Sequence, residues 1–186
     1  MNADEDVGSR IRKANGAFIQ LSRLWKNRNV SRATKIRIFN TNVKSVLLYG
    51  CETWKITGRI VGQLQTFINR CLRRITCIYW PEVISNENLW QLTNQCPVQE
   101  ELKRRKWRWI GHTLRKEDGA IEKAALSWNP QGSRRQGRPR MTWRRTVEAE
   151  CRQQRKTWAE VKRLAANRDE WRTFSDALCF SRSERN

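Results

Sequence analysis

The spacing of hydrophobic residues along the chain predicts a protein built from helices. Between residues 10 and 26, apolar side chains recur at steps of three and four, which is the spacing of one face of an α-helix. Residues 60–75 have the most regular pattern, because apolar positions there follow the 3.6-residue period without a break. No alternating strand pattern longer than a few residues and no internal repeat is present. We therefore predict an all-α fold of about eight helices.

Polar residues at the ends of these segments predict where helices begin and end. Ser31 and Ser85 have the positions of N-caps, and Pro97 has the position of a first-turn proline. Thr157 and Glu160 have the spacing of a capping box. Gly50 follows an apolar run and is typical of a helix stop.

Basic residues are concentrated between Lys103 and Arg145, where 14 Lys or Arg occur against three acids. In the helix predicted after Pro97, one stripe is expected to face inward, formed by Val98, Leu102, Trp109, Ile110 and Leu114. The remaining circumference is expected to be a broad cationic face, formed by Lys103, Arg104, Arg105, Lys106 and Arg108.

The segment 129–140 contains no apolar residue and is the one candidate domain boundary. It suggests four regions: a helical region 1–80, a basic Trp-rich helical region 81–128, a basic linker 129–140 and a C-terminal helical region 141–186. Gly137 to Arg140 reads Gly-Arg-Pro-Arg, which is similar to the core of an AT-hook that lies in narrow minor grooves. A flexible basic linker is the alternative that the short motif leaves open, and the one we favour.

The charge of the whole chain favours RNA or DNA as a partner. Lys and Arg total 38 against 18 acids, a net charge of +20 and a pI near 10.8. A solvated helix face explains any single charge run, but the chain-wide excess favours a polyanionic partner. Candidate phosphate contacts are Lys103, Arg104, Arg105, Lys106, Arg108, Arg134, Arg135, Arg138 and Arg140. The sequence has no apolar run long enough to span a bilayer, so no membrane is expected.

Ten tryptophans are spread at about one for each helix-sized segment. We favour the interpretation that they are large core anchors. The alternative is that some stack on bases, and Trp107 and Trp109 are the candidates because they lie among arginines and lysines.

The sequence contains none of the motifs that assemble a catalytic site, so we expect no enzyme, no metal and no cofactor. The six cysteines form no Cys-x-x-Cys pair, and the one histidine, His112, has no cysteine within its own helical turn. The N-terminus is acidic and lacks the apolar core of a secretory signal. We therefore expect a nuclear or cytoplasmic protein with reduced, semi-buried cysteines.

Several short motifs occur in an order that resembles a known family. They include Thr-Lys-Ile-Arg-Ile-Phe at 34–39, Val-Leu-Leu-Tyr-Gly-Cys-Glu-Thr-Trp at 46–54 and Cys-Leu-Arg-Arg-Ile at 71–75. Further along are Trp-Arg-Trp-Ile-Gly-His-Thr-Leu-Arg at 107–115, Gly-Arg-Pro-Arg at 137–140 and Arg-Asp-Glu-Trp-Arg at 168–172. In this order, residues 1–180 resemble the end of the reverse transcriptase of non-LTR retrotransposons of the RTE-like kind. The resemblance implies that residues 1–80 correspond to a helical thumb, and later residues to a region that helps hold template RNA and target DNA.

The sequence departs from that family in one decisive feature. Family polymerases have a Tyr-x-Asp-Asp turn that binds two catalytic metals, whereas this sequence contains no Asp-Asp pair. We therefore expect a truncated, non-catalytic nucleic-acid-binding fragment. The alternatives are a structural remnant or a protein-interaction module with no retained activity, and an active enzyme whose missing parts are supplied in trans.

Overall fold

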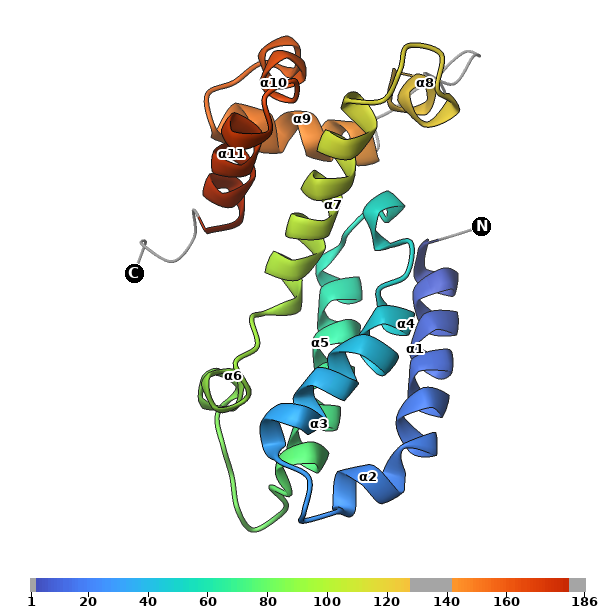
Figure 1. The fold of residues 1–186 in the computed structure, drawn as a ribbon, viewed down its shortest axis with the longest axis vertical. Coiled ribbons are helices and arrows are strands. Elements are labelled where there is room, and N and C mark those ends of the chain that lie inside the picture. Colours follow the sequence, from blue (N-terminus) through green and yellow to red (C-terminus); the bar gives the residue numbers. More distant parts are fainter. Residues whose placement is uncertain (1–2, 128–141, 181–186) are drawn as a thin grey trace. The chain divides into compact units, whose positions relative to one another are not determined.

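The computed structural model describes residues 3–127 and 142–180, and every regular element in these ranges is a helix (Figure 1). The prediction of an all-α protein is therefore confirmed. The short α2 (Ser22–Lys26) is separated from the preceding helix by a turn at Leu21, whereas the short α4 (Ser45–Leu47) directly continues the helical segment before it. The described chain forms two compact units, one from residues up to 51 with 56–101, the other from 52–55 with residues from 102 onward.

In the first unit, the long helix α1 (Ala3–Gln20) packs against α4, η1 (Phe39–Lys44) and α5 (Gly58–Thr76). Phe18 lies at the centre of an aromatic cluster, stacked on Trp25 at 5.1 Å between ring centroids and edge-on to Phe39 at 6.4 Å. The Trp25 indole N–H donates to the Phe18 carbonyl (2.8 Å), so α2 is fixed back onto the end of α1. The remaining helices of the first unit pack around this cluster.

The predicted helix after Ser31 begins as expected and continues to Leu47, with a π-helical stretch in its middle. The Ser31 hydroxyl accepts from the Thr34 N–H at the start of α3 (Arg32–Ile38), which confirms the predicted cap. The chain continues into the π-helix η1 and then α4, and Gly50 follows at φ +73°. A glycine fits that left-handed position without steric cost, so the predicted stop at Gly50 is also confirmed.

Helix α5 contains the apolar stripe that the sequence predicted at residues 60–75, and it ends in a left-handed residue. Ile60, Leu64, Phe67, Ile68, Cys71, Leu72 and Ile75 are all buried. Cys77 adopts φ 58°, and the Ile78 N–H donates to the Arg73 carbonyl, a bond that satisfies one of the last free carbonyls of the helix.

Helix α6 (Asn86–Thr93), capped by Ser85 as predicted, packs on α5 and α3. A chain of side-chain hydrogen bonds joins α6 to α5, because Asn69 Oδ1 accepts from the Trp90 indole N–H (2.8 Å) and Asn69 Nδ2 donates to Asn86. This packing places residues 81–101 in the first unit, so the compact unit extends past the boundary at residue 80 predicted from the sequence.

The second unit is formed by α7 (Val98–Leu114) from residue 102, with α9 (Trp143–Gln153), α10 (Trp158–Leu164) and α11 (Arg168–Phe180). Thr157 and Glu160 form the predicted capping box at the start of α10. The core consists of Trp107, Ile110, Val147, Cys151, Val161, Ala165, Trp171, Phe174 and Leu178. Residues 102–127 and 142–180 thus share one core, although the sequence suggested two separate regions; α8 (Ile121–Ser127) also belongs to this unit.

Candidate nucleic-acid interface

One side of α7 packs against the core of the second unit. Trp107 is completely buried, with its ring 5.9 Å from Trp171 and 5.5 Å from Phe174 between centroids. Ile110 is also fully buried, and Gly111 lies against the Trp171 indole. Because these residues face inward, the opposite side of α7 is the one that solvent and partners reach.

A single carboxylate satisfies two of the buried polar groups on this inner side. Glu150 of α9 accepts from Lys106 Nζ through Oε1 (2.7 Å) and from the Trp107 indole N–H through Oε2 (2.7 Å). The Lys106 side chain is only 2% exposed, so its charge is balanced inside the unit. An ammonium held in this way is not available to a phosphate.

These contacts correct two of the residues predicted to bind nucleic acid. Lys106 and Trp107 are core residues, so neither a phosphate contact by Lys106 nor base stacking by Trp107 fits the structure. The sequence pattern placed Trp109 on the inward face of the helix. In the structure, Trp107 is the tryptophan that fills the core. Trp109 is only partly buried and packs edge-on to Trp143 at 6.0 Å. Lys103 is half-buried and donates to the Leu178 carbonyl (2.6 Å), which makes it a contact to α11.

The other predicted residues of α7 do lie on its outward side. At 100° per residue, four positions of α7 fall within about 100° of the helix circumference, namely Arg104, Arg105, Arg108 and His112, and Arg115, the residue that follows α7, continues the row. Arg108, His112 and Arg115 are exposed, and Arg104 and Arg105 are half-buried. Arg115 also donates to the Ala165 carbonyl (3.1 Å), which leaves the rest of its guanidinium to face solvent. We call these five residues the α7 basic stripe. His112 and Arg115 were not among the predicted site residues, although the same helical period would have found them.

The α7 basic stripe is about 16 Å long from Arg104 to Arg115, at 1.5 Å per residue. No acid shares that face of α7 from residue 102 onward; Glu101, one turn before Arg104 and Arg105, lies on the same face and forms an ion pair with Lys44. Helix α9 differs, because Glu148 accepts from Arg144 (3.1 Å) and lies 4.0 Å from Arg152.

Arg134, Arg135, Arg138 and Arg140 lie outside the described residues, as does the predicted linker 129–140. For these four arginines, the proposed phosphate contacts stay predictions from the sequence.

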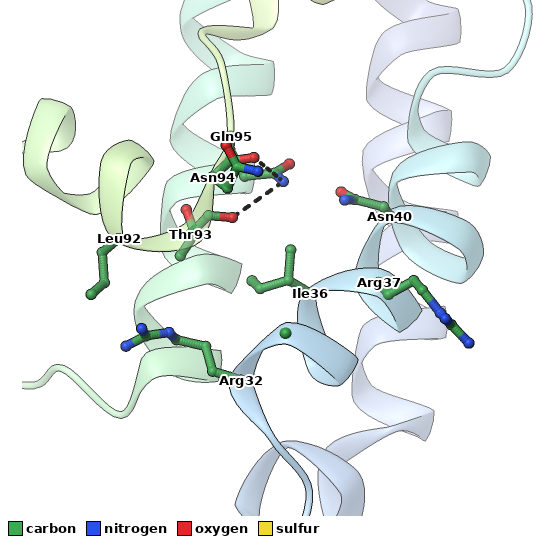
Figure 2. A pocket seen from close by; sticks show the side chains of 9 residues that line it. Arg32, Ile36, Arg37, Asn40, Leu92, Thr93, Asn94 and Gln95 are labelled. Carbon is green, nitrogen blue, oxygen red and sulfur yellow. Dashed lines mark hydrogen bonds between the residues drawn. The ribbon is translucent and has the colours of Figure 1, made fainter.

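The first unit contains a hollow of about 430 Å³ between α3, η1 and the end of α6 (Figure 2). Asn40 points from η1 toward Gln95 across the hollow, and Gln95 is held by hydrogen bonds to the Thr93 and Asn94 carbonyls. Arg37 points away from the centre. The lining consists of amides, two arginines, a threonine and aliphatic side chains, so it offers hydrogen bonds but no nucleophile paired with a base.

Four of the six cysteines are buried, Cys96 is partly buried and Cys77 is exposed. Burial raises the pKa of the Cys71 thiol to about 12 despite the opposing charges of Arg70 and Arg74, and raises that of Cys151 to about 11.

In the part of the chain that the structure describes, His, Cys, Asp and Glu nowhere gather in threes that could hold a metal ion. None of the helices in that part is long and apolar enough to cross a membrane.

Comparison with known proteins gives one match. A family model described as a domain of unknown function (DUF6451) matches residues 17–49, which include the end of α1, α2, α3 and η1. The match covers one wall of the hollow, including Ile36 and Asn40, and lies outside the α7 basic stripe. No curated protein and no solved structure matches the chain.

Proposed function

We propose that this chain binds RNA or DNA without catalysing a reaction, and that the α7 basic stripe is its principal contact surface. The observation on which this rests is that the outward face of α7 from residue 102 onward, together with the residue that follows the helix, presents four arginines and a histidine and no acid. Phosphates are attracted to such a face whatever the base sequence. The affinity is therefore expected to depend strongly on salt concentration and weakly on base sequence. The resemblance to the end of a retrotransposon reverse transcriptase is part of this proposal.

The rigidity of α7 supports the proposal. The helix is anchored on its inner side by Trp107, Ile110 and the Glu150 carboxylate, so its outward side chains start from a fixed backbone. A surface that is ordered before binding loses less conformational entropy when it meets its partner. The chain-wide charge of +20 adds long-range attraction that increases the association rate.

The experiment is a titration of the purified chain into a fluorescently labelled RNA hairpin and a labelled DNA duplex, from about 50 to about 200 mM salt. If the four arginines each neutralise one phosphate, log K against log salt is expected to have a slope of about −3.6 on duplex DNA. Absence of binding up to about 100 µM protein, the weak end of non-specific affinities, would contradict the proposal. In that case a structural or protein-interaction role would be favoured instead.

A further inference from the structure

The segment between α5 and α6 exposes aromatic rings in an otherwise ordered part of the first unit. Trp80 is 87% exposed, Tyr79 is 58% exposed and Val83 is 80% exposed. The other tryptophans that the structure describes are buried or partly buried, so Trp80 is the exception to their role as core anchors. A single exposed apolar residue is ordinary on a protein surface, but two adjacent aromatic rings and a valine within five residues form a patch that needs an explanation.

Both ends of this segment are fixed to Arg73. The Ile78 N–H donates to the Arg73 carbonyl (3.0 Å), and the Arg73 guanidinium donates to the Ile84 carbonyl (3.4 Å) and to Asn86 Oδ1 (2.9 Å). Between these anchors, the Glu82 N–H donates to the Tyr79 carbonyl (2.8 Å) and closes a turn around Trp80. The aromatic rings are thus presented on a defined backbone.

The helix that supports the segment is basic. Helix α5 contains four arginines and no acid, and Arg70 and Arg74 are exposed one turn apart at the end from which the segment leaves. The Arg70 guanidinium is also 5.7 Å from the centroid of the Phe67 ring. Glu82 is the one acid in the segment 77–84, and it reduces but does not reverse the positive charge of this end of α5.

We infer that Trp80 and Tyr79 form a stacking platform for unpaired bases of single-stranded RNA or DNA, with Arg70 and Arg74 contacting the adjacent phosphates. Every base has a flat face that can stack on an aromatic ring, and cationic side chains beside the ring hold the backbone. Exposed rings in the segment that follows the basic end of a helix fit this partner better than an apolar protein surface, which would have to bury the Arg70 and Arg74 charges. The inference rests on the proposed function, but it uses residues of the first unit alone.

The test compares the full chain with Trp80→Ala, Trp80→Phe and Val83→Ala variants for binding to labelled single strands of U or dT of about 20 nucleotides and to a duplex of equal length. Trp80→Ala is expected to weaken single-strand binding about 5- to 150-fold, the equivalent of ~1–3 kcal/mol for one stacked base. Trp80→Phe retains a ring and should recover most of the affinity, while Val83→Ala, in the same segment, should change it little. The salt slope should be the same in all of them, because no charge is changed.

The outcomes separate this inference from the proposed function. Suppose that the chain binds duplex and single strands with a steep salt slope, but that Trp80→Ala has wild-type affinity for single strands. That result would contradict the stacking platform and leave the proposed basic surface standing. Equal weakening on duplex and single strands would also contradict stacking. If the unchanged chain binds neither duplex nor single strands, both proposals fail. A loss of self-association in Trp80→Ala, with unchanged nucleic-acid affinity, would assign the patch to contacts between copies of the chain. Matching far-UV circular dichroism of the three variants would show that each remains folded.

Discussion

Gly111 and Trp171 are in such close contact that no other residue fits at position 111. A methyl group on Gly111 would lie 2.1 Å from the Trp171 indole Nε1 and 2.3 Å from Cε2. The neighbour is a buried ring, 5% exposed, so it has little room to move aside. The glycine in the Trp-Ile-Gly-His run of α7 is therefore explained by packing against α11.

Gly111→Ala is expected to destabilise the folded chain. A glycine-to-alanine change in an unobstructed helix, by contrast, stabilises the fold. Overpacking of a core costs about 1–3 kcal/mol, and a clash with a ring belongs at the upper end of that range. Gly62 in α5 is the matched control, because a methyl group there would meet nothing within 4 Å. Gly62→Ala should increase the free energy of unfolding by about 0.5–1 kcal/mol. Urea denaturation of both variants measures the difference, and equal effects of the two changes would contradict the close contact.

Glu150→Ala is expected to destabilise the second unit by about 3–5 kcal/mol, because it leaves the buried Lys106 ammonium without its carboxylate. It also removes the acceptor of the Trp107 indole N–H. Glu148→Ala on the same helix is the control, since its ion pairs with Arg144 and Arg152 are at the surface and each contributes at most about 1 kcal/mol. Similar stabilities of the two variants in urea denaturation would show that the Glu150 contacts are not formed.

Arg108 and Trp107 are adjacent in the sequence, but their replacement by alanine is expected to have different effects. Arg108→Ala should lower the affinity for nucleic acid, and Trp107→Ala should lower the free energy of unfolding. Arg108 is exposed on the α7 basic stripe, so its removal should weaken nucleic-acid binding and change the free energy of unfolding by no more than about 0.5 kcal/mol. Trp107 is fully buried, so Trp107→Ala should cost about 3–5 kcal/mol of stability. Affinity and urea denaturation measured on both variants test this. Loss of affinity in a stable, folded Trp107→Ala chain would contradict its assignment to the core.

Cys71 and Cys77 are expected to differ in reactivity toward iodoacetamide at pH 8. The thiolate is the reactive form, and a pKa raised from 9.0 to about 12 leaves about a thousandfold less of it at Cys71. Cys77 is exposed and should be alkylated first. Between pH 9 and 12 the unfolded chain releases the Cys71 proton while the folded chain keeps it, so the free energy of unfolding should fall as pH rises through that range. Mass spectrometry of the alkylated peptides measures the order, and equal labelling of the two cysteines would contradict the burial of Cys71.

The elements that could be predicted from the sequence are those defined by neighbouring residues. The caps at Ser31, Ser85 and Thr157 and the apolar stripe of α5 depend on residues within one or two turns, and the structure has them where the pattern placed them. The π-helical winding of η1 within the second predicted helix was missed, because an apolar period does not distinguish a π-helix from an α-helix.

The candidate site was predicted only in part, because long-range partners decide which charges are exposed. Glu150 is 44 residues from Lys106, and without it a buried lysine in the middle of a basic run could not be expected. Trp107 and Trp109 both lie in that run, and the choice between them depends on Trp171 and Phe174 of α11. The exposure of Trp80 depends likewise on the Arg73 contacts that fix the segment after α5.

The most direct test of the α7 basic stripe compares two variants that lose the same charge. One replaces Arg104, Arg108 and Arg115 with Gln, and the other replaces the exposed arginines of α10 and α11, Arg163, Arg168 and Arg172, with Gln. Binding to the DNA duplex is measured across the salt series for both. The stripe variant is expected to lose affinity and to have a salt slope smaller by about 2.7, whereas the control should keep a slope close to that of the unchanged chain. Equal losses in the two variants would contradict a defined interface on α7 and would show that the net charge alone attracts nucleic acid.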